Sequence, residues 1–311
     1  MVGGALVLAA CGSDGPQATA TFPIQAGGDP TTSTTRFADR PSPALPADGE
    51  VHVINPGDEP RVDLRHAPEA GTQRVEVVTT TRTTAESGGQ KQTLATPSLT
   101  ETLEVTAADR EDGRYDVRQE VIDIQVGSGG SKAGRAAAEQ SADVLVGLAT
   151  TGVIDQQGRA TDVAIDLPKD APPLYEGIIN QLESMMDQLA LPVPEEPIGV
   201  GGSWTTTKPI DLLGATIHIT SRTTLQSVDA AGYTVRTVVE MSADGDQPIT
   251  SAGQDGTLVS FQGNGSGVST VRFNRLAPES QTRSWGEQVF EIDGRTLSQE
   301  VETTARTRPT D

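Results

Sequence analysis

The feature that most constrains the fold of this chain is a long series of segments in which apolar and polar residues alternate. One segment carries apolar or Thr side chains at every second position over a full strand: Tyr233, Val235, Thr237, Val239 and Met241. Alternation sends successive side chains to opposite faces of a β-strand, and the Val and Thr residues that dominate 74–84 suit a pleated sheet. Asp112-Gly113 and Asp293-Gly294 are pairs typical of tight hairpin turns. The sequence therefore predicts an antiparallel β-sheet.

These patterns predict strands over 51–54, 61–65, 74–84, 93–106, 115–126, 151–155, 159–166, 217–219, 233–241, 257–262, 267–276, 282–292 and 295–303. Within 115–126 the apolar residues change face, because Tyr115 and Val117 alternate out of step with Ile122 and Ile124. We expect a β-bulge near 119–121 at this change.

Two segments have a helical pattern instead. The first runs to about Ala190 and places one apolar stripe at the helical period: Leu174, Ile178, Leu182, Met185, Met186 and Leu189. Pro172 and Pro173 suit its first turn, and Pro192 prevents its continuation. The second is the Ala-rich segment 132–148. We therefore predict an α+β fold in which a curved antiparallel sheet, an open half-barrel, wraps around one or two central helices.

A proline-rich strap follows the first helix. Pro192, Pro194 and Pro197 favour an extended path, and the glycines at 199–202 permit a bend before Trp204. Trp204 and Trp285 either pack on the sheet or line the mouth of a cavity.

Composition limits the possible functions. Of the 311 residues, 35% are hydrophobic, which suffices for one substantial core. The formal net charge of -20 argues against a nucleic-acid partner, since such partners require a basic surface. Cys11 is the single cysteine, so the chain forms no internal disulfide.

The chain shows no arrangement of residues typical of catalysis, and we expect neither an enzyme nor a cofactor or metal site. The glycine loop 127–130 precedes Lys132, but Ser131 and Ala133 flank the lysine, where a phosphate loop requires Gly and then Ser or Thr. His52, His66 and His218 lie far apart in the sequence, and we predict a surface position for each.

The N-terminal segment ends in Leu8-Ala9-Ala10-Cys11, followed by Gly12 and Ser13. It resembles the lipobox of bacterial lipoproteins, in which the cysteine carries the lipid. The segment lacks the basic residues and the longer apolar core of a signal peptide, so we expect that residues are missing upstream. Residues 12–50 are rich in Gly, Ser, Thr and Pro, and we predict a disordered tether there. A single folded domain is then expected over 51–311.

The whole layout is similar to exported lipoproteins of actinobacterial type, and 191–204 looks like a recurring element of an uncharacterised family. The architecture also resembles the lipoprotein-carrier (LolA-like) superfamily, in which a half-barrel and a helical lid hold acyl chains. This resemblance implies a membrane-anchored cell-envelope lipoprotein that binds an apolar or lipid-like ligand along the stripe from Leu174 to Leu189. The alternative is an envelope structural or protein-interaction lipoprotein without a ligand cavity. We expect a monomer outside the cytoplasm, held by Cys11 on the outer face of the cell membrane.

Overall fold

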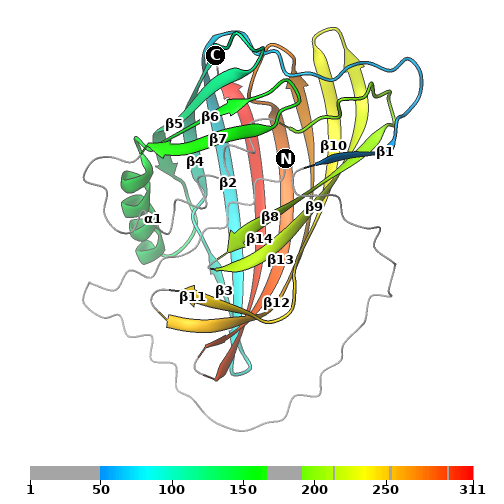
Figure 1. The fold of residues 1–311 in the computed structure, drawn as a ribbon. Helices are drawn as coiled ribbons and strands as arrows, with labels where there is room; N and C mark the ends of the chain where they lie inside the picture. The colour runs from blue at the N-terminus through cyan, green and yellow to red at the C-terminus, as the bar shows by residue number, and fades with distance from the viewer. Residues whose placement is uncertain (1–49, 167–190, 213, 252–253, 293, 311) are drawn as a thin grey trace.

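The computed structural model describes residues 50–166, 191–212, 214–251, 254–292 and 294–310 (Figure 1). The described residues form fourteen strands and one helix. In chain order these are β1 (Val51–Asn55), β2 (Gly71–Ser87), β3 (Gln90–Ala95), β4 (Leu99–Asp109), β5 (Tyr115–Val126), α1 (Lys132–Leu145), β6 (Ala149–Ile154), β7 (Ala160–Asp166), β8 (Ser203–Leu212), β9 (Ala215–Asp229), β10 (Gly232–Ala243), β11 (Gln247–Ser251), β12 (Gln254–Arg272), β13 (Glu279–Ile292) and β14 (Arg295–Thr310).

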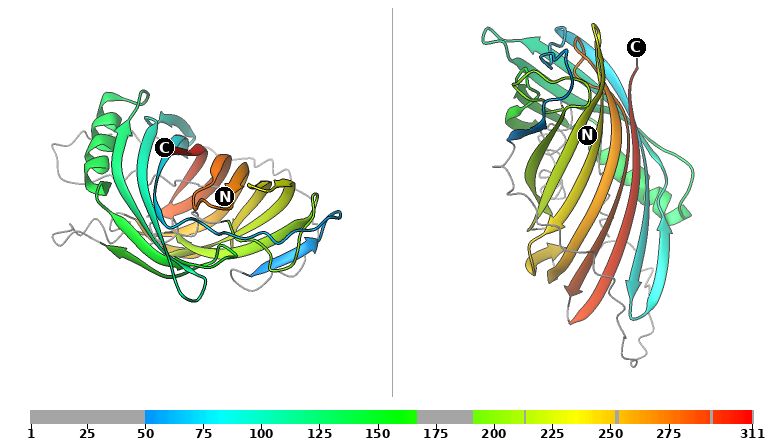
Figure 2. Two further views of the ribbon diagram at one scale, coloured as in Figure 1. Left: turned by 90° about the horizontal axis from the view of Figure 1, so that it is seen from above. Right: turned by 90° about the vertical axis from the view of Figure 1, so that its right-hand side faces the viewer.

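All of these strands belong to one antiparallel sheet. Its order is β1-β8-β9-β10-β12-β13-β14-β2-β4-β5-β6-β7, while β11 pairs with β12 and β3 pairs with β2. Each end strand of this order, β1 and β7, has one neighbour, so the sheet is open. Seen from above, the sheet curves strongly and has a concave and a convex face (Figure 2).

The predicted antiparallel sheet is confirmed, but the α+β prediction with central helices is wrong. The one described helix, α1, packs beside β5 at the outer edge of the sheet and not inside its curve (Figure 1). The sequence of α1 consists mostly of Ala and polar residues, so it has no broad apolar face with which to fill a core. The helix predicted up to Ala190 lies outside the described residues.

Three strand predictions also need correction. Segment 61–65 forms a single bridge between Val62 and Ile198 instead of a strand. Segment 93–106 divides into β3 and β4, which pair with different parts of β2. Segment 257–262 and residues 267–272 are two parts of the continuous strand β12, because glycines within a strand weakened the sequence signal without ending the pairing, whereas 273–276 lie in the loop after it. The predicted bulge in β5 is present, one residue further along, at Ile122.

Three apolar clusters form the core. The helix-side cluster joins β2, β4, β5 and β6 with the loop after β12: Val75, Leu103, Val105, Ala107, Val117, Val121, Ile154, Leu276 and Ala277. The strap cluster joins β8, β9, β10 and β12 with two loops: Leu64, Leu191, Val193, Ile198, Trp204, Leu225, Tyr233, Val235 and Val271. The far-end cluster joins β9, β11, β12 and β13: Ala215, Ile217, Ile249, Leu258, Phe261 and Phe290.

Candidate functional site

Two loop segments cross one end of the curved sheet. We call 56–66 and 191–202 together the strap, and the end that they cross the capped end (Figure 1). The two segments bond to each other, since the backbone N–H groups of Val62 and Ile198 donate to each other's carbonyl oxygens at 3.0 and 2.9 Å. The Val193 N–H donates to the Gln157 carbonyl at 2.9 Å, and the Gly201 N–H donates to the Leu225 carbonyl at 2.9 Å. The strap therefore joins the turn after β6 to β9, on the other side of the open sheet.

Glycines allow the two halves of the strap to touch. A Cβ atom on Gly199 would overlap the carbonyl oxygen of Asp58, and one on Gly202 would collide with Ile198. Gly57 has a φ of +79° and lies against the Gly199 carbonyl. The glycines that the sequence assigned to a bend therefore serve close backbone packing as well.

Trp204 anchors the strap to the sheet. Its side chain is 1% exposed and packs in the strap cluster. Its indole Nε1–H donates to the carbonyl oxygen of Pro192 at 3.0 Å. Of the two expectations for this residue, packing on the sheet is the one observed. Trp285 is half-buried on β13 and donates its Nε1–H to the Glu300 carboxylate at 2.9 Å.

His66 lies in the strap and is 1% exposed, so its predicted surface position is wrong. Its Nε2 atom lies 2.9 Å from the Leu191 carbonyl oxygen, and its buried Nδ1 atom has no partner among the described residues. Burial lowers the pKa of His66, although its bond to Leu191 and the nearby Asp155 carboxylate act in the opposite direction. This burial was not predictable from the sequence, because the surrounding strap has no periodic pattern. His218 is half-exposed on β9 and bonds to Asp244 at 3.0 Å.

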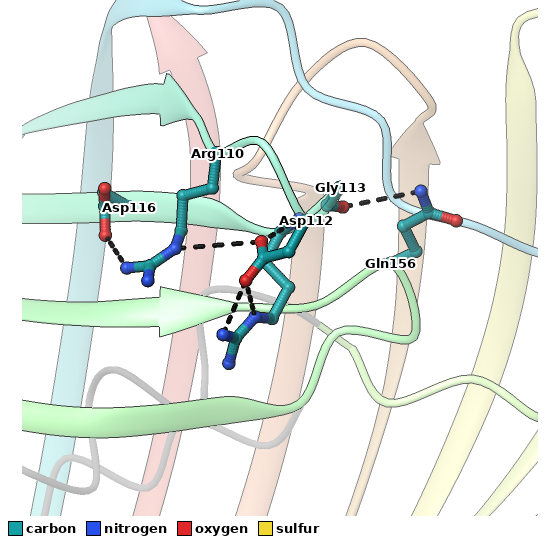
Figure 3. A network of polar contacts seen from close by, with 6 residues as sticks. Arg110, Asp112, Gly113, Asp116 and Gln156 are labelled. Atoms are coloured by element: carbon teal, nitrogen blue, oxygen red, sulfur yellow. Dashed lines mark hydrogen bonds and ion pairs between the residues drawn. The ribbon is translucent and has the colours of Figure 1, made fainter.

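A network of charged side chains fixes the turn between β4 and β5 beside the strap (Figure 3). The Arg110 guanidinium pairs with Asp116 at 2.7 Å and with Asp112 at 3.8 Å. Gln156, in the turn after β6, donates from Nε2 to the Gly113 carbonyl oxygen at 3.4 Å. These charges are solvent-exposed, so their contribution to stability is small. Through Gln156 this turn is joined to the turn after β6, to which the strap is bonded.

The floor of the concave face is polar between the apolar clusters. We call nine buried Ser and Thr residues the hydroxyl belt: Thr79, Thr81, Thr223, Thr237, Ser269, Ser280, Thr282, Ser284 and Thr303. They come from six neighbouring strands, β9, β10, β12, β13, β14 and β2. Each has an exposed fraction of 9% or less.

Register brings these hydroxyls into rows across the sheet. Thr223 is paired with Thr237, Thr237 with Gly267 and Gly267 with Thr282. A second row pairs Ser284 with Thr303, and Thr303 with Thr81. The Oγ1 atoms of Thr223 and Thr237 lie 3.0 Å apart, and those of Thr81 and Thr303 lie 3.4 Å apart. The belt therefore separates the far-end cluster from the two clusters at the capped end.

A separate hollow of about 750 Å³ lies at the ends of β10, β12, β13 and β14. Arg272 and Arg308 line it, and each has an acidic partner: Asp229 at 3.9 Å and Glu76 at 2.7 Å. Both guanidinium groups are thus paired with carboxylates, and we take the concave face as the better candidate site.

The residues that the sequence singled out for function lie outside the described part of the chain. These are the lipid-attachment residue Cys11 and the candidate ligand-facing residues Leu174, Ile178, Leu182, Met185, Met186 and Leu189. In the described ranges, no helix is long and apolar enough to cross a membrane. The same ranges contain no group of three or more His, Cys, Asp or Glu residues placed to hold a metal ion.

The described residues thus form an open, strongly curved antiparallel sheet with one capped end. A model described as "Family of unknown function (DUF6263)" matches residues 179–276, which include the strap segment 191–202 and strands β8 to β12. The expectation of an uncharacterised family is thus supported over this part of the chain.

Comparison with other proteins adds little. No curated protein matches the chain. Two mutant porins of Rh. blastica are each 10% identical to the chain. Each match covers 77% of this chain and 100% of the porin, and the TM-scores are 0.21 and 0.20. A likeness at this level supports no conclusion about fold or function. These comparisons do not point to a lipoprotein or to the lipoprotein-carrier superfamily.

Proposed function

We propose that this protein is a cell-envelope lipoprotein, held on the outer face of the membrane through Cys11, that binds an apolar or lipid-like ligand on its concave face. The hydroxyl belt is the observation that carries the ligand part of this proposal. Buried positions usually hold apolar side chains, and buried polar groups require hydrogen-bond partners. A floor with apolar clusters on either side of a polar belt suits a ligand that has both an apolar and a polar part.

The anchoring part rests on the lipobox-like segment ending at Cys11 and on the polar composition of 12–50. A chain of that composition has too little apolar surface to offset the entropy of ordering. It suits a tether between a lipid anchor and the folded domain.

The test is native mass spectrometry of the full-length protein, extracted gently from its own host. The expected result is copurified lipid, with less of it in the variant Thr282→Val/Thr303→Val, which removes two belt hydroxyls at nearly constant volume. Thr304→Val, at an exposed position on β14, is the matched control and should retain the lipid.

One observation favours a second function, that of an envelope structural or interaction protein without a ligand cavity. Ile217, Leu225, Leu258 and Val271 are all 0% exposed, as in an ordinary packed core. Absence of copurified lipid, together with a melting temperature that lipid does not change, would favour this alternative.

A further inference from the structure

The hollow at the ends of β10, β12, β13 and β14 carries a local reversal of charge. The chain has 43 acidic and 23 basic residues, yet three of the eleven residues that line the hollow are arginines and one is acidic. The arginines are Arg272, Arg275 and Arg308, and the acid is Glu279. The side chains of Arg272 and Arg308 are 50% and 51% exposed, so a ligand can reach them from solvent.

The carboxylate partners of two of these arginines differ in kind. Nη2 of Arg308 lies at hydrogen-bond distance, 2.7 Å, from the Glu76 carboxylate, whereas Nη1 of Arg272 lies 3.9 Å from Oδ1 of Asp229. The same Asp229 oxygen already accepts two backbone N–H groups, those of Ala231 and Gly232, at 2.7 and 2.9 Å. Among the described residues, the Arg272 guanidinium therefore has a charge nearby but no acceptor at hydrogen-bond distance.

Backbone hydrogen bonds hold the walls of the hollow in place. The Phe273 N–H donates to the Ala231 carbonyl at 3.0 Å, and the Phe273 carbonyl accepts the Ala67 N–H at 2.9 Å. The Arg275 N–H closes a turn onto the Arg272 carbonyl at 3.0 Å. The loop after β12 is thus fixed on both sides, which suits a preformed site for a small molecule.

The other lining residues limit the chemistry of a ligand. Phe273, Pro309 and three alanines supply apolar surface beside the arginines. A planar guanidinium presents its donors as a fork that matches the two oxygens of a carboxylate. The Glu279 carboxylate disfavours a second negative charge in the same hollow, and Arg308 is already bound to Glu76. The volume of about 750 Å³ is in the range of small-molecule sites.

We propose that this hollow binds a small monocarboxylate with an apolar body, whose carboxylate accepts two hydrogen bonds from Arg272 and whose body lies against Phe273 and Pro309. The hollow is separate from the hydroxyl belt, so this inference does not depend on the proposed lipid-like ligand. The neutral amide of the same acid has no charge and only one acceptor oxygen, so it binds more weakly.

The experiment titrates the full chain with three probes that share a phenylethyl body: 3-phenylpropanoate, 3-phenylpropanamide and 2-phenylethyl phosphate. Ligand-observed NMR at pH 7.5 measures the affinities. The wild type is expected to bind the carboxylate at least about tenfold more tightly than the amide, which corresponds to about 1.4 kcal/mol. It should also prefer the carboxylate to the doubly charged phosphate.

Two variants connect this preference with the hollow. Arg272→Gln should bind the carboxylate and the amide equally, because the guanidinium fork is lost. Arg236→Gln makes the same change of charge at an exposed position on β10 outside the hollow, and it should keep the preference. Asp229→Asn retains an oxygen for the two backbone N–H groups and removes the competing charge, so it should bind the carboxylate about two- to fivefold more tightly.

Each contrary result overturns the proposal. Equal binding of carboxylate and amide by the wild type, or binding of neither, shows that the hollow does not select a carboxylate. An equal loss in Arg272→Gln and Arg236→Gln indicates general attraction to positive charge instead of a site. Tighter binding of the phosphate overturns the assignment to a monoanion. Unchanged melting temperatures of the variants, expected for exposed positions, show that the fold is intact. Thr282→Val/Thr303→Val should bind the carboxylate as the wild type does, which separates this site from the hydroxyl belt.

Discussion

The imidazole Nε2 atom of His66 lies 2.9 Å from the carbonyl oxygen of Leu191, so one buried side chain joins the two halves of the strap. The Nε2 atom must donate in this bond, which leaves Nδ1 as the unprotonated nitrogen of a neutral ring. Because Nδ1 is buried without a partner among the described residues, a second proton there would place an unpaired charge in the interior. The bond therefore makes the strap sensitive to acid.

We predict that stability falls as the pH decreases below about 6.5 because of this residue. The pKa of His66 is lowered in the folded protein from the usual 6.5, so the unfolded chain binds the proton first as the pH decreases. Its contribution to stability is complete above 6.5 and is lost as the pH falls towards the folded pKa, with a slope of at most about 1.4 kcal/mol per pH unit. Urea unfolding at a series of pH values measures the slope.

The control for this prediction is the exposed His52. His66→Gln should lower stability at neutral pH and remove most of the pH dependence, whereas His52→Gln should leave the wild-type profile. An unchanged slope in His66→Gln would show that other groups cause the effect.

Gly199→Ala should destabilise the protein by about 3 kcal/mol, because the added methyl group overlaps the backbone carbonyl of Asp58, which cannot move aside as a flexible side chain can. Gly286→Ala is the matched control. Its Cβ atom would lie 3.7 Å from the nearest atom outside its chain neighbours, the Gln262 carbonyl oxygen. Thermal melts compare the two variants, and similar melting temperatures for both would contradict close packing of the strap.

Trp204→Phe should cost about 2–4 kcal/mol, since it removes the donor to the Pro192 carbonyl and leaves unfilled volume in the strap cluster. Trp285→Phe also removes an indole donor, but its partner is the half-exposed Glu300 carboxylate, which water can solvate. We expect a loss of about 1 kcal/mol or less there. Denaturant midpoints of the two variants give the comparison, and the reverse order of losses would show that Trp204 does not anchor the strap.

Cys11→Ala should move the protein from the membrane to the soluble fraction when it is expressed with its native export signal in its own host. The reason is that Cys11 is the proposed attachment point of the lipid, and a single residue change leaves the tether and domain otherwise intact. Ser13→Ala is the control and should remain with the membrane. Membrane retention of Cys11→Ala in a fractionation experiment would contradict the anchoring proposal.

Local patterns in the sequence determined the strands. The alternation from Tyr233 to Met241 and the turn at Asp112-Gly113 each depend on a few neighbouring residues, and they appear in the structure as predicted. The strands on either side of the predicted turn at 293–294 pair with each other as β13 and β14. The bulge at Ile122 followed in the same way from a change of face within one strand. Such features are readable because side-chain direction in a strand has a period of two.

Pairing between distant segments was decided by the tertiary structure. Nothing in the sequence placed β14 beside β2, and that pairing brings Thr303 next to Thr81. Thr suits either face of a sheet, so its position in a strand does not show that it will be buried. The hydroxyl belt and the burial of His66 therefore arise only when strands and strap come together, since each depends on contacts between residues far apart in the chain.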